Sequence, residues 1–265
     1  MHIKVLKKNE YEKLLAVRDV PELKRAALPF ILFRDIEIMP SGSRLHSNER
    51  PNLKLLIPKL KKIYELRVKT YSEGIYSFAR CGINRRGEDS YYYRYLAKEI
   101  DSLIESASIP TELQESFDIC LKMWNIGIAR YKDKYFHRYE ILHGDLHEGN
   151  MLYWINNIYL IDWEYLRSGP KEMELSFFLC WHYLQNTNQY TDFQLLEEEL
   201  QLMIKESLID RELCAIIKTM LIPMWFLVDI CYLSKGLLAF PEERKKQLVK
   251  MVPLYVSYLN NGREA

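Results

Sequence analysis

The sequence has few of the features that mark several common protein classes. Its 265 residues include five cysteines, an odd number with no C-x-x-C pair, which disfavours a disulfide framework or a zinc module and suits reduced thiols in the cytoplasm. The 37 Lys and Arg residues nearly balance the 36 Asp and Glu residues, so no overall field attracts nucleic acid or an anionic membrane. The charged first 13 residues lack the apolar core of a signal peptide.

Long apolar runs are also missing. The most apolar stretch, Met220–Leu233, is shorter than the roughly 20 residues that span a bilayer and contains Asp229, so we predict a buried helix there. Hydrophobic residues nevertheless make up 48% of the chain, which is enough for a sizeable core. We therefore expect a globular protein with neither a nucleic-acid nor a membrane partner.

Hydrophobic periodicity divides the chain into a mixed start and a mainly helical remainder. The segments 30–33 and 36–39 read as strands, and Pro40-Ser41-Gly42 breaks the pattern. Beyond this break, most of the chain has helical spacing of apolar residues, at 52–71, 92–104, 111–129 and from 171 onward. Three short apolar segments in the middle read as strands, at 139–142, 150–154 and 158–161. We predict an α+β protein with a small mixed lobe at 1–42 and a large, mainly helical lobe at 43–265.

The middle strands enclose a segment whose residue spacing matches a chemical template. Residues 143–150 read H-G-D-L-H-E-G-N, and residues 161–164 read I-D-W-E. The phosphoryl-transfer template is H-R-D-L-x-x-x-N followed by D-F-G, and these segments supply His143, Asp145, Asn150 and Asp162 in the same order. Glycine replaces the template's Arg, and Trp-Glu replaces Phe-Gly.

This pattern suits transfer of a γ-phosphoryl group, which depends on positioning and charge neutralisation. Asp145 would lie beside the acceptor hydroxyl and take its proton. The amide oxygen of Asn150 and the carboxylate of Asp162 are hard oxygen ligands, which suit Mg²⁺. A hairpin over 153–159, with a turn at Asn156-Asn157, would bring these two ligands together.

The two motifs together resemble the aminoglycoside phosphotransferase and choline kinase group, which are small-molecule kinases with a protein-kinase-like two-lobe fold. The resemblance covers residues 139–180 and extends more weakly through the rest of the chain. It implies an enzyme that uses ATP and Mg²⁺ to phosphorylate a hydroxyl of an aminoglycoside-, choline- or sugar-like molecule, with a catalytic loop at 141–164. The alternative is a non-catalytic kinase-like protein with a binding or regulatory role.

The resemblance also implies a strand lysine in the first lobe that pairs with a helix glutamate and holds the ATP phosphates. We assign Lys7 and Glu12 to these roles. Lys4 and Glu10 are the alternative pair, because the spacing between strand and helix is tight. A solvated surface pair is the other reading of Lys7 and Glu12.

The same resemblance identifies 36–39 as the hinge strand, where the backbone of Ile38 and Met39 would meet adenine. In this fold two strands and a phosphate-covering loop normally precede the lysine strand, but only a handful of residues precede Lys7. The ten glycines form neither G-x-G-x-x-G nor G-x-x-x-x-G-K-[ST]. We therefore expect a truncated first lobe that lacks its first hairpin, a nucleotide that is covered differently, or weak binding.

Several residues near the motif have two readings each. His143 reads as a structural residue of the loop, and His147 as loop support or a substrate contact. Glu164 and Glu174 would bind substrate or metal, or make loop hydrogen bonds. A cationic acceptor would need an acidic pocket, and the candidates for it are Asp229, Glu172 and Glu174.

Two segments support weaker alternatives. The letters G-D-L-H at 144–147 alone suggest a metallophosphatase, but a two-metal site needs further His and Asp clusters, and the remaining histidines lie in no such context. Arg85-Arg86 followed by the tyrosine-rich 91–95 has the composition of a nucleic-acid-binding strip. The balanced total charge favours a helix with one buried aromatic face.

Overall fold

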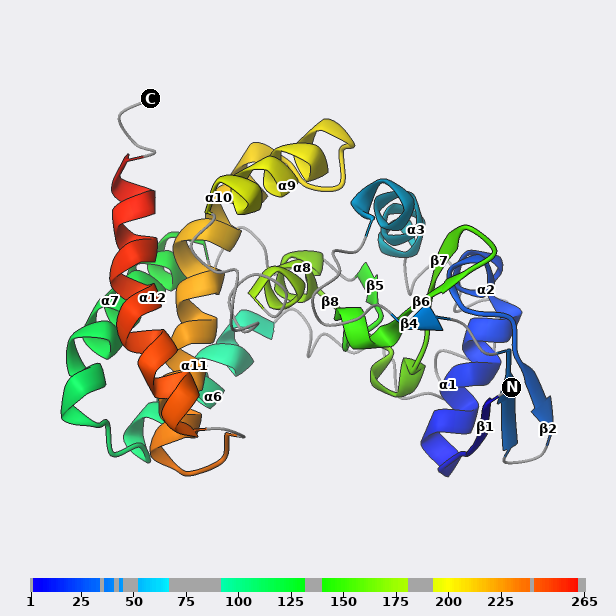
Figure 1. The fold of residues 1–265 in the computed structure, drawn as a ribbon, viewed down its shortest axis with the longest axis horizontal. Coiled ribbons are helices and arrows are strands. Elements are labelled where there is room, and N and C mark those ends of the chain that lie inside the picture. The colour runs from blue at the N-terminus through cyan, green and yellow to red at the C-terminus, as the bar shows by residue number, and fades with distance from the viewer. Residues whose placement is uncertain are drawn as a thin grey trace. The chain divides into compact units, whose positions relative to one another are not determined.

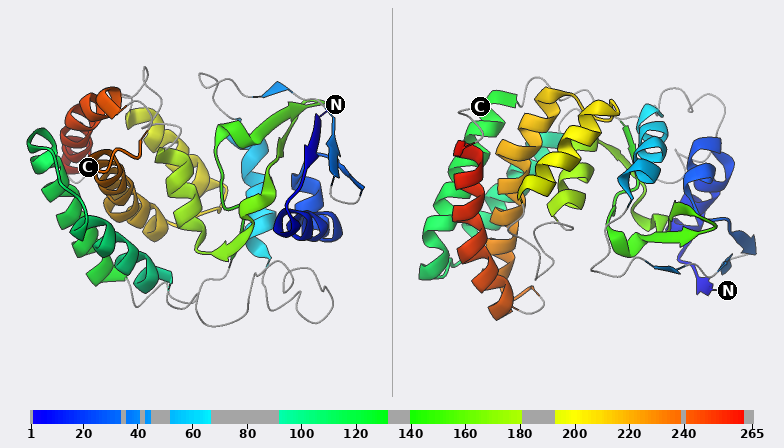
Figure 2. Two further views of the ribbon diagram at one scale, coloured as in Figure 1. Left: turned by 90° about the horizontal axis from the view of Figure 1, so that it is seen from below. Right: turned by 45° about the horizontal axis from the view of Figure 1, so that its top comes forward.

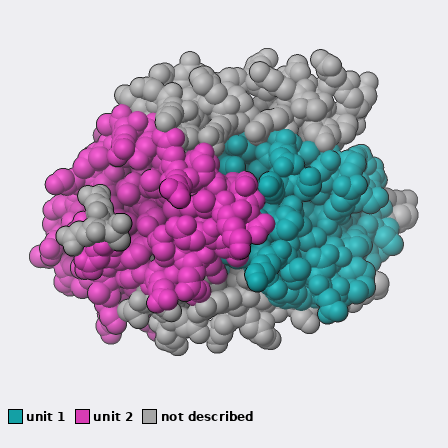
Figure 3. Space-filling view, turned by 90° about the horizontal axis from the view of Figure 1, so that it is seen from above, with its two compact units in different colours: residues 1–89, 138–174 teal, residues 90–137, 175–265 magenta. Residues whose placement is uncertain are grey.

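A computed structural model describes residues 2–33, 36–40, 43–44, 52–66, 92–131, 140–180, 193–238 and 241–261. The chain divides into two compact units, which Figure 3 distinguishes by colour. The first unit comprises residues 1–89 and 138–174, and the second comprises residues 90–137 and 175–265. This division differs from the predicted lobes at 1–42 and 43–265, and the strand pairing within the first unit explains why.

The first unit contains a three-stranded antiparallel sheet in the order β1-β3-β2 (Figure 1). Its strands are β1 (His2–Val5), β2 (Ile31–Phe33) and β3 (Ile36–Met39). The last two confirm the strands predicted near these positions. Lys4 pairs with Glu37, and Glu37 pairs with Leu32, so these three side chains lie on one face of the sheet. The sheet therefore presents a lysine and a glutamate together on that face.

Two helices connect β1 to β2, namely α1 (Lys8–Asp19) and α2 (Pro21–Ala26). Pro21 occupies the first position of α2, where a missing N–H costs no helical hydrogen bond. Just after α2, the N–H of Leu28 donates to the carbonyl of Leu160 at 3.2 Å. The N-terminal segment is thus joined to the middle of the chain.

The remaining strands of the first unit come from the middle of the chain and from the segment after the predicted boundary. They are β4 (Ser43–Arg44), β5 (Glu140–Leu142), β6 (Met151–Trp154), β7 (Asn157–Leu160) and β8 (Arg167–Gly169). Strands β6 and β7 form a hairpin, β4 pairs with β6, and β5 pairs with β8. The three predicted middle strands are present. Because β4 joins this hairpin, the chain continues within one unit beyond residue 42.

The hairpin turn is centred one residue earlier than predicted. Trp154 pairs with Asn157, so the two turn residues are Ile155 and Asn156 rather than Asn156 and Asn157. Both turn residues have positive φ, 50° and 56°, as a two-residue hairpin of the mirror-image type requires. The prediction assumed that both asparagines would occupy these strained positions, whereas a β-branched isoleucine takes the first.

Helix α3 (Leu53–Glu65) packs against α2, β5 and β7. It begins after Asn52, whose side chain accepts the N–H of Lys54 at 3.1 Å. Its buried face contains the leucine and isoleucine residues that the helical spacing predicts, Leu53, Leu56, Leu60 and Ile63. The predicted helix at 52–71 is confirmed to residue 65, and the part beyond 66 lies outside the described residues, as does the Arg85-Arg86 segment.

The second unit is helical in its described residues. Its helices are α6 (Tyr92–Glu105), η2 (Thr111–Leu113), α7 (Gln114–Tyr131), α9 (Phe193–Lys205), α10 (Arg211–Ile216), η6 (Ile217–Leu221), α11 (Ile222–Ser234) and α12 (Pro241–Asn261). Helices α7, α11 and α12 lie side by side (Figure 2). Helix α8 (Lys171–Cys180) crosses the division between the units.

The most apolar helical stretch is longer than the sequence indicates. Helical structure runs continuously over Arg211–Ser234, and these 24 residues are long and apolar enough to cross a membrane by length and composition. We predicted a buried helix here because the apolar stretch is too short to cross a membrane. That reason is wrong, since the helix is long enough. The predicted burial is confirmed, because 78% of the apolar window is buried inside the structure.

Candidate active site

The β6–β7 hairpin brings the motif residues together. The N–H of Ile161 donates to the carbonyl of Asn150 at 2.9 Å, which places Asn150 beside the residue that precedes Asp162. The side-chain amide of Asn150 donates to both the carboxylate Oδ2 and the carbonyl of Asp145, each at 2.9 Å. These two bonds use the amide nitrogen, so the amide oxygen remains the atom that could bind a cation.

Asp162 has an unusual backbone conformation. Its φ and ψ are 60° and 61°, in the left-handed region that costs a non-glycine residue of the order of 1–3 kcal/mol. Its carboxylate accepts from Lys4 Nζ at 2.9 Å, an ion pair that joins β1 to the end of the hairpin. Strain of this kind is typical of functional positions, where neighbouring structure holds the residue in place.

Of the two lysine–glutamate pairs that the sequence leaves open, the structure brings Lys4 and Glu10 to the motif. Lys4 Nζ lies 3.9 Å from Glu10 Oε1 as well as 2.9 Å from Asp162. Lys7 lies at the start of α1, where its backbone N–H donates to Glu10 Oε2 at 2.9 Å and its side chain is exposed. Glu12 is half-buried on α1.

Lys4 is surrounded by carboxylates. Glu164 Oε2 lies 3.9 Å from Lys4 Nζ, and a hydrogen bond between Glu10 and Glu164 lowers the pKa of Glu10 and raises the pKa of Glu164. Glu37, across from Lys4 on β3, is buried, and this burial raises its pKa to about 7. The lysine therefore has more negative partners than its single charge can neutralise.

His143 holds the start of the loop in place. Its side chain is fully buried, its Nε2 lies 2.8 Å from the carbonyl of Ile161, and its ring centroid lies 4.5 Å from that of Trp163. Burial lowers the pKa of His143 to about 4, so the ring is neutral at pH 7 and Nε2 carries the proton that it donates to Ile161. These contacts match the structural reading of His143.

His147 contacts the predicted base directly. Its Nε2 lies 3.4 Å from Asp145 Oδ2, and its Nδ1 accepts the N–H of Gly149 at 3.1 Å. A side chain at position 149 would clash with this ring, because an added Cβ would lie 2.7 Å from His147 Cε1. The hydrogen bond from His147, followed by the bond from Asn150, lowers the pKa of Asp145 and favours its charged form.

Glu174 binds the backbone of the loop, one of the two readings that the sequence leaves open. It is buried on α8, and its carboxylate accepts the N–H of His143 at 3.3 Å and the N–H of Gly144 at 2.5 Å. Tyr64 on α3 donates its hydroxyl to the same carboxylate at 2.8 Å. Sequence reasoning missed Tyr64, because nothing in its local pattern distinguishes it from a core residue of an amphipathic helix.

An apolar cluster lies next to the predicted hinge strand. Leu28, Leu152 and Ile161 are buried together, and Met39 packs against them. Ile38, the other predicted hinge residue, is half-buried on β3. Leu152 was missed by sequence reasoning, although its place two residues after Asn150 on a strand was a usable signal.

The oxygen atoms of the motif fit a hard divalent cation. Asn150 and Asp162 supply an amide and a carboxylate oxygen from adjacent ends of one hairpin, which is the donor set that Mg²⁺ prefers. In the part of the chain that the structure describes, no three His, Cys, Asp or Glu side chains form a metal-binding group.

Two of the candidates for an acidic substrate pocket have other partners. Arg244 Nε donates to Asp229 Oδ2 at 3.1 Å, and Arg244 Nη2 donates to the same oxygen. Asp229 is therefore neutralised by a half-buried arginine, and Glu174 is occupied by the loop amides and Tyr64. Neither carboxylate offers an open negative charge to a cationic acceptor.

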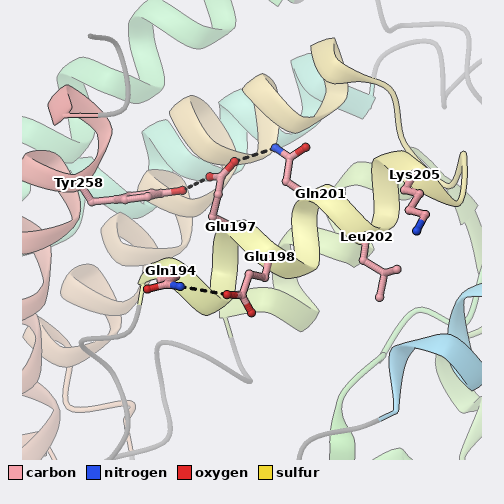
Figure 4. A pocket seen from close by; sticks show the side chains of 7 residues that line it. All are labelled: Gln194, Glu197, Glu198, Gln201, Leu202, Lys205 and Tyr258. Atoms are coloured by element: carbon pink, nitrogen blue, oxygen red, sulfur yellow. Dashed lines mark hydrogen bonds between the residues drawn. The ribbon is translucent and has the colours of Figure 1, made fainter. Parts of the chain in front are cut away.

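The second unit has a separate open concavity of about 690 Å³ along α9 and beside Tyr258 (Figure 4). Its central carboxylate, Glu197, accepts from Gln201 at 2.8 Å and from Lys218 at 2.7 Å. The Tyr258 hydroxyl donates to Glu197 as well. Because these polar groups satisfy one another, we assign no ligand to this surface.

The sequence matches no family model and no curated protein. Its structure is similar to solved structures of small-molecule kinases. An aminoglycoside phosphotransferase from Alicyclobacillus acidocaldarius aligns with a TM-score of 0.60 and 12% identity, over 99% of this chain and 85% of that chain. A choline kinase from Cryptosporidium parvum aligns with a TM-score of 0.54 and 15% identity, over 99% of this chain and 81% of that chain.

The chain has the choline kinase and aminoglycoside phosphotransferase fold. This finding confirms the resemblance that the two motifs carry. A choline kinase from Streptococcus pneumoniae with this fold, in complex with AMP, aligns with a TM-score of 0.50 and 18% identity, over 96% of this chain and 84% of that chain. Small-molecule phosphotransfer is the activity that the names of these similar proteins share.

Proposed function

We propose that the protein is an ATP-dependent phosphotransferase that moves the γ-phosphoryl group of ATP to a hydroxyl of a small molecule. The observation that carries the proposal is the joining of Asp145 to Asn150 by two side-chain hydrogen bonds, with the hairpin pairing Asn150 to the residue before Asp162. A base and two metal ligands are the three groups that this chemistry needs in one place.

Asp145 is the base in this proposal. Its Oδ2 is occupied by Asn150 and His147, which leaves Oδ1 to accept the hydrogen bond of an acceptor hydroxyl. As the hydroxyl oxygen bonds to the γ-phosphorus, its proton passes to Asp145 and the bond from phosphorus to the leaving ADP oxygen breaks. The low pKa that His147 and Asn150 impose keeps Asp145 ionised and able to take the proton.

Lys4 takes the role first assigned to Lys7, and Glu10 the role first assigned to Glu12. Lys4 lies opposite Glu37 of the predicted hinge strand β3 and forms an ion pair with Asp162. The Lys7 side chain is instead exposed to solvent at the start of α1. Lys4 would hold the ATP phosphates while Glu10 steadies its ammonium group. The backbone of Ile38 and Met39 would meet adenine.

The apolar cluster of Leu28, Leu152 and Ile161, against which Met39 packs, would contact the adenine ring. Asn150 and Asp162 would hold Mg²⁺, which when bound neutralises charge on the β- and γ-phosphates. The AMP complex of the similar choline kinase supports a nucleotide site in this fold. The first unit would thus bind the nucleotide, with a small-molecule hydroxyl as the second substrate.

A second candidate, a kinase-like binding protein without catalysis, is favoured by the charge around Lys4. Glu10, Glu37, Asp162 and Glu164 surround one lysine, and an acidic site repels phosphates unless a cation is bound. Under this reading nucleotide affinity would be negligible. Thermal-shift titration with ATP, with and without Mg²⁺, separates the two candidates. A ligand present at a concentration of 100 times its Kd stabilises the folded protein by about 2.7 kcal/mol.

The decisive test is ATP consumption in the presence of hydroxylated antibiotics, amino alcohols and sugars. We expect turnover with one acceptor class, and a loss of roughly 10²–10⁴-fold in Asp145→Asn, with the Mg·ATP thermal shift retained. Asp118→Asn on the exposed face of α7 is the matched control and should keep full activity. Undiminished turnover in Asp145→Asn, or no Mg·ATP shift in the wild-type protein, would refute the proposal.

A further inference from the structure

A tyrosine far from the motif in sequence reaches the base of the catalytic loop. Tyr64 lies near the end of α3 and is 3% exposed. Its hydroxyl donates to Glu174 Oε1 at 2.8 Å, across 110 positions of sequence. The phenol therefore reaches a carboxylate that is itself 2% exposed, so neither group can exchange this bond for one to bulk water.

The bonds to Glu174 are unequal in length. Its Oε2 accepts the N–H of Gly144 at 2.5 Å, whereas its Oε1 accepts the N–H of His143 at 3.3 Å, longer than most amide hydrogen bonds. The short partner of Oε1 is Tyr64. With three donors aimed at it, the carboxylate acts as an acceptor only, and the tyrosine determines where one of its two oxygens lies.

The loop that Glu174 holds has little freedom to move. Gly144 has a φ of +90°, and a Cβ added there would lie 1.9 Å from the carbonyl oxygen of Tyr165. The backbone of the loop is thus packed closely against the segment that follows Asp162. Asp145 is the next residue, so a shift of the Gly144 amide displaces the Asp145 carboxylate with it.

We propose that Tyr64 is a positioning residue: it fixes the Glu174 carboxylate, which holds the amides of His143 and Gly144 and so sets the position of Asp145. The catalytic consequence of this inference rests on the proposed function. The contacts from Tyr64 through Glu174 to the loop amides do not depend on that function, because their effect on the loop can be measured without turnover.

The first experiment is amide hydrogen exchange, resolved by residue, in Tyr64→Phe. We expect exchange at His143 and Gly144 to accelerate about tenfold or more, with the β6 and β7 amides of Met151 and Leu160 unchanged. Unchanged exchange at both loop amides, or equal acceleration across the whole first unit, would overturn the inference.

The matched control is Tyr255→Phe. Tyr255 is a 1% exposed tyrosine on α12 whose hydroxyl donates to the carbonyl of Lys218, also at 2.8 Å. The substitution Tyr255→Phe removes a comparable buried hydrogen bond that has no connection to the loop. We expect no local change at His143 or Gly144 in this variant, and a change equal to that of Tyr64→Phe would show that the effect is general loosening.

The second experiment uses Mg·ATP and the acceptor that supports wild-type turnover. We expect Tyr64→Phe to lower kcat about ten- to a hundredfold, as a base displaced by a fraction of an ångström would, with the KM for ATP changed less than about twofold. The double variant Tyr64→Phe/Glu174→Gln should be no slower than Glu174→Gln alone, because the tyrosine acts through the carboxylate. Additive losses, or a change in KM alone, would overturn the inference.

A wild-type protein without turnover would refute the proposed function and leave the exchange experiment to decide the role of Tyr64.

Discussion

The substitution Glu37→Gln tests the electrostatics of the carboxylates that surround Lys4. Glu37 lies on the middle strand of the first sheet, opposite Lys4, and is 6% exposed. Burial raises its pKa from 4.5 to about 7, with Lys4 opposing the shift and Asp162 and Glu10 adding to it. Gln keeps the shape of the protonated side chain and cannot ionise.

The sign of the effect follows from the direction of the shift. The pKa of Glu37 is higher in the folded than in the unfolded protein, so the stability gained by holding its proton is full below about pH 4.5 and is lost as the pH rises through about 7. The difference between the two pKa values corresponds to about 3 kcal/mol, at about 1.4 kcal/mol per unit. We expect Glu37→Gln to match the wild type near pH 4.5 and to be more stable than it by up to about 3 kcal/mol at pH 8.

Urea unfolding of the nucleotide-free proteins at pH 5 and pH 8 measures this difference. Titrating groups other than the neighbours Lys4, Asp162 and Glu10 contribute equally to wild type and variant and cancel in the comparison. Glu65→Gln is the matched control, because Glu65 lies in the same unit with its side chain 55% exposed. We expect no pH-dependent advantage from this control. If the advantage of Glu37→Gln were the same at both pH values, the reasoning from burial and charge would be refuted.

Two further substitutions test the backbone of the loop and of the hairpin. Gly144→Ala places a Cβ 1.9 Å from the Tyr165 carbonyl at a φ of +90°, so we expect a loss of about 2–5 kcal/mol in thermal unfolding together with loss of turnover. Gly236→Ala, with a φ of +67° and open space, should lose only the strain of about 1 kcal/mol, and equal losses would contradict the clash. Ile155→Asn relieves a β-branched residue at a φ of 50° in an exposed turn and should raise the melting temperature by roughly 2–4 °C; a lower value would count against the strain.

The segment that carries the motif was predictable because the proposed chemistry depends on local spacing. Asp145 and Asn150 lie five residues apart on one loop, and a short hairpin returns the chain to Asp162. Both distances are set by loop and strand lengths that the sequence encodes directly. The strands at 30–33 and 36–39 were predictable for the same reason, since alternation of side chains along a short strand is a local property.

The choice between Lys4 and Lys7 was not local in this sense. Lys4 lies on a strand and Lys7 lies at the start of a helix, so the pairing of β1 with β3 decides which ammonium group faces the motif. Side chains alternate along the strand, and the pairing of Lys4 with Glu37 turns Lys4 toward Asp162. Positions 4 and 7 differ by an odd number, so even a longer β1 would place Lys7 on the face opposite to Lys4.

By itself the sequence determined which chemical groups the protein carries and the order in which a loop and a hairpin present them. The tertiary structure decided what surrounds those groups: that Glu174 is occupied by loop amides and Tyr64, that Asp229 is neutralised by Arg244, and that four carboxylates share Lys4. Such contacts join residues up to 158 positions apart. Burial and partner, and through them charge state, depend on how separate elements pack, and no pattern within one segment records that.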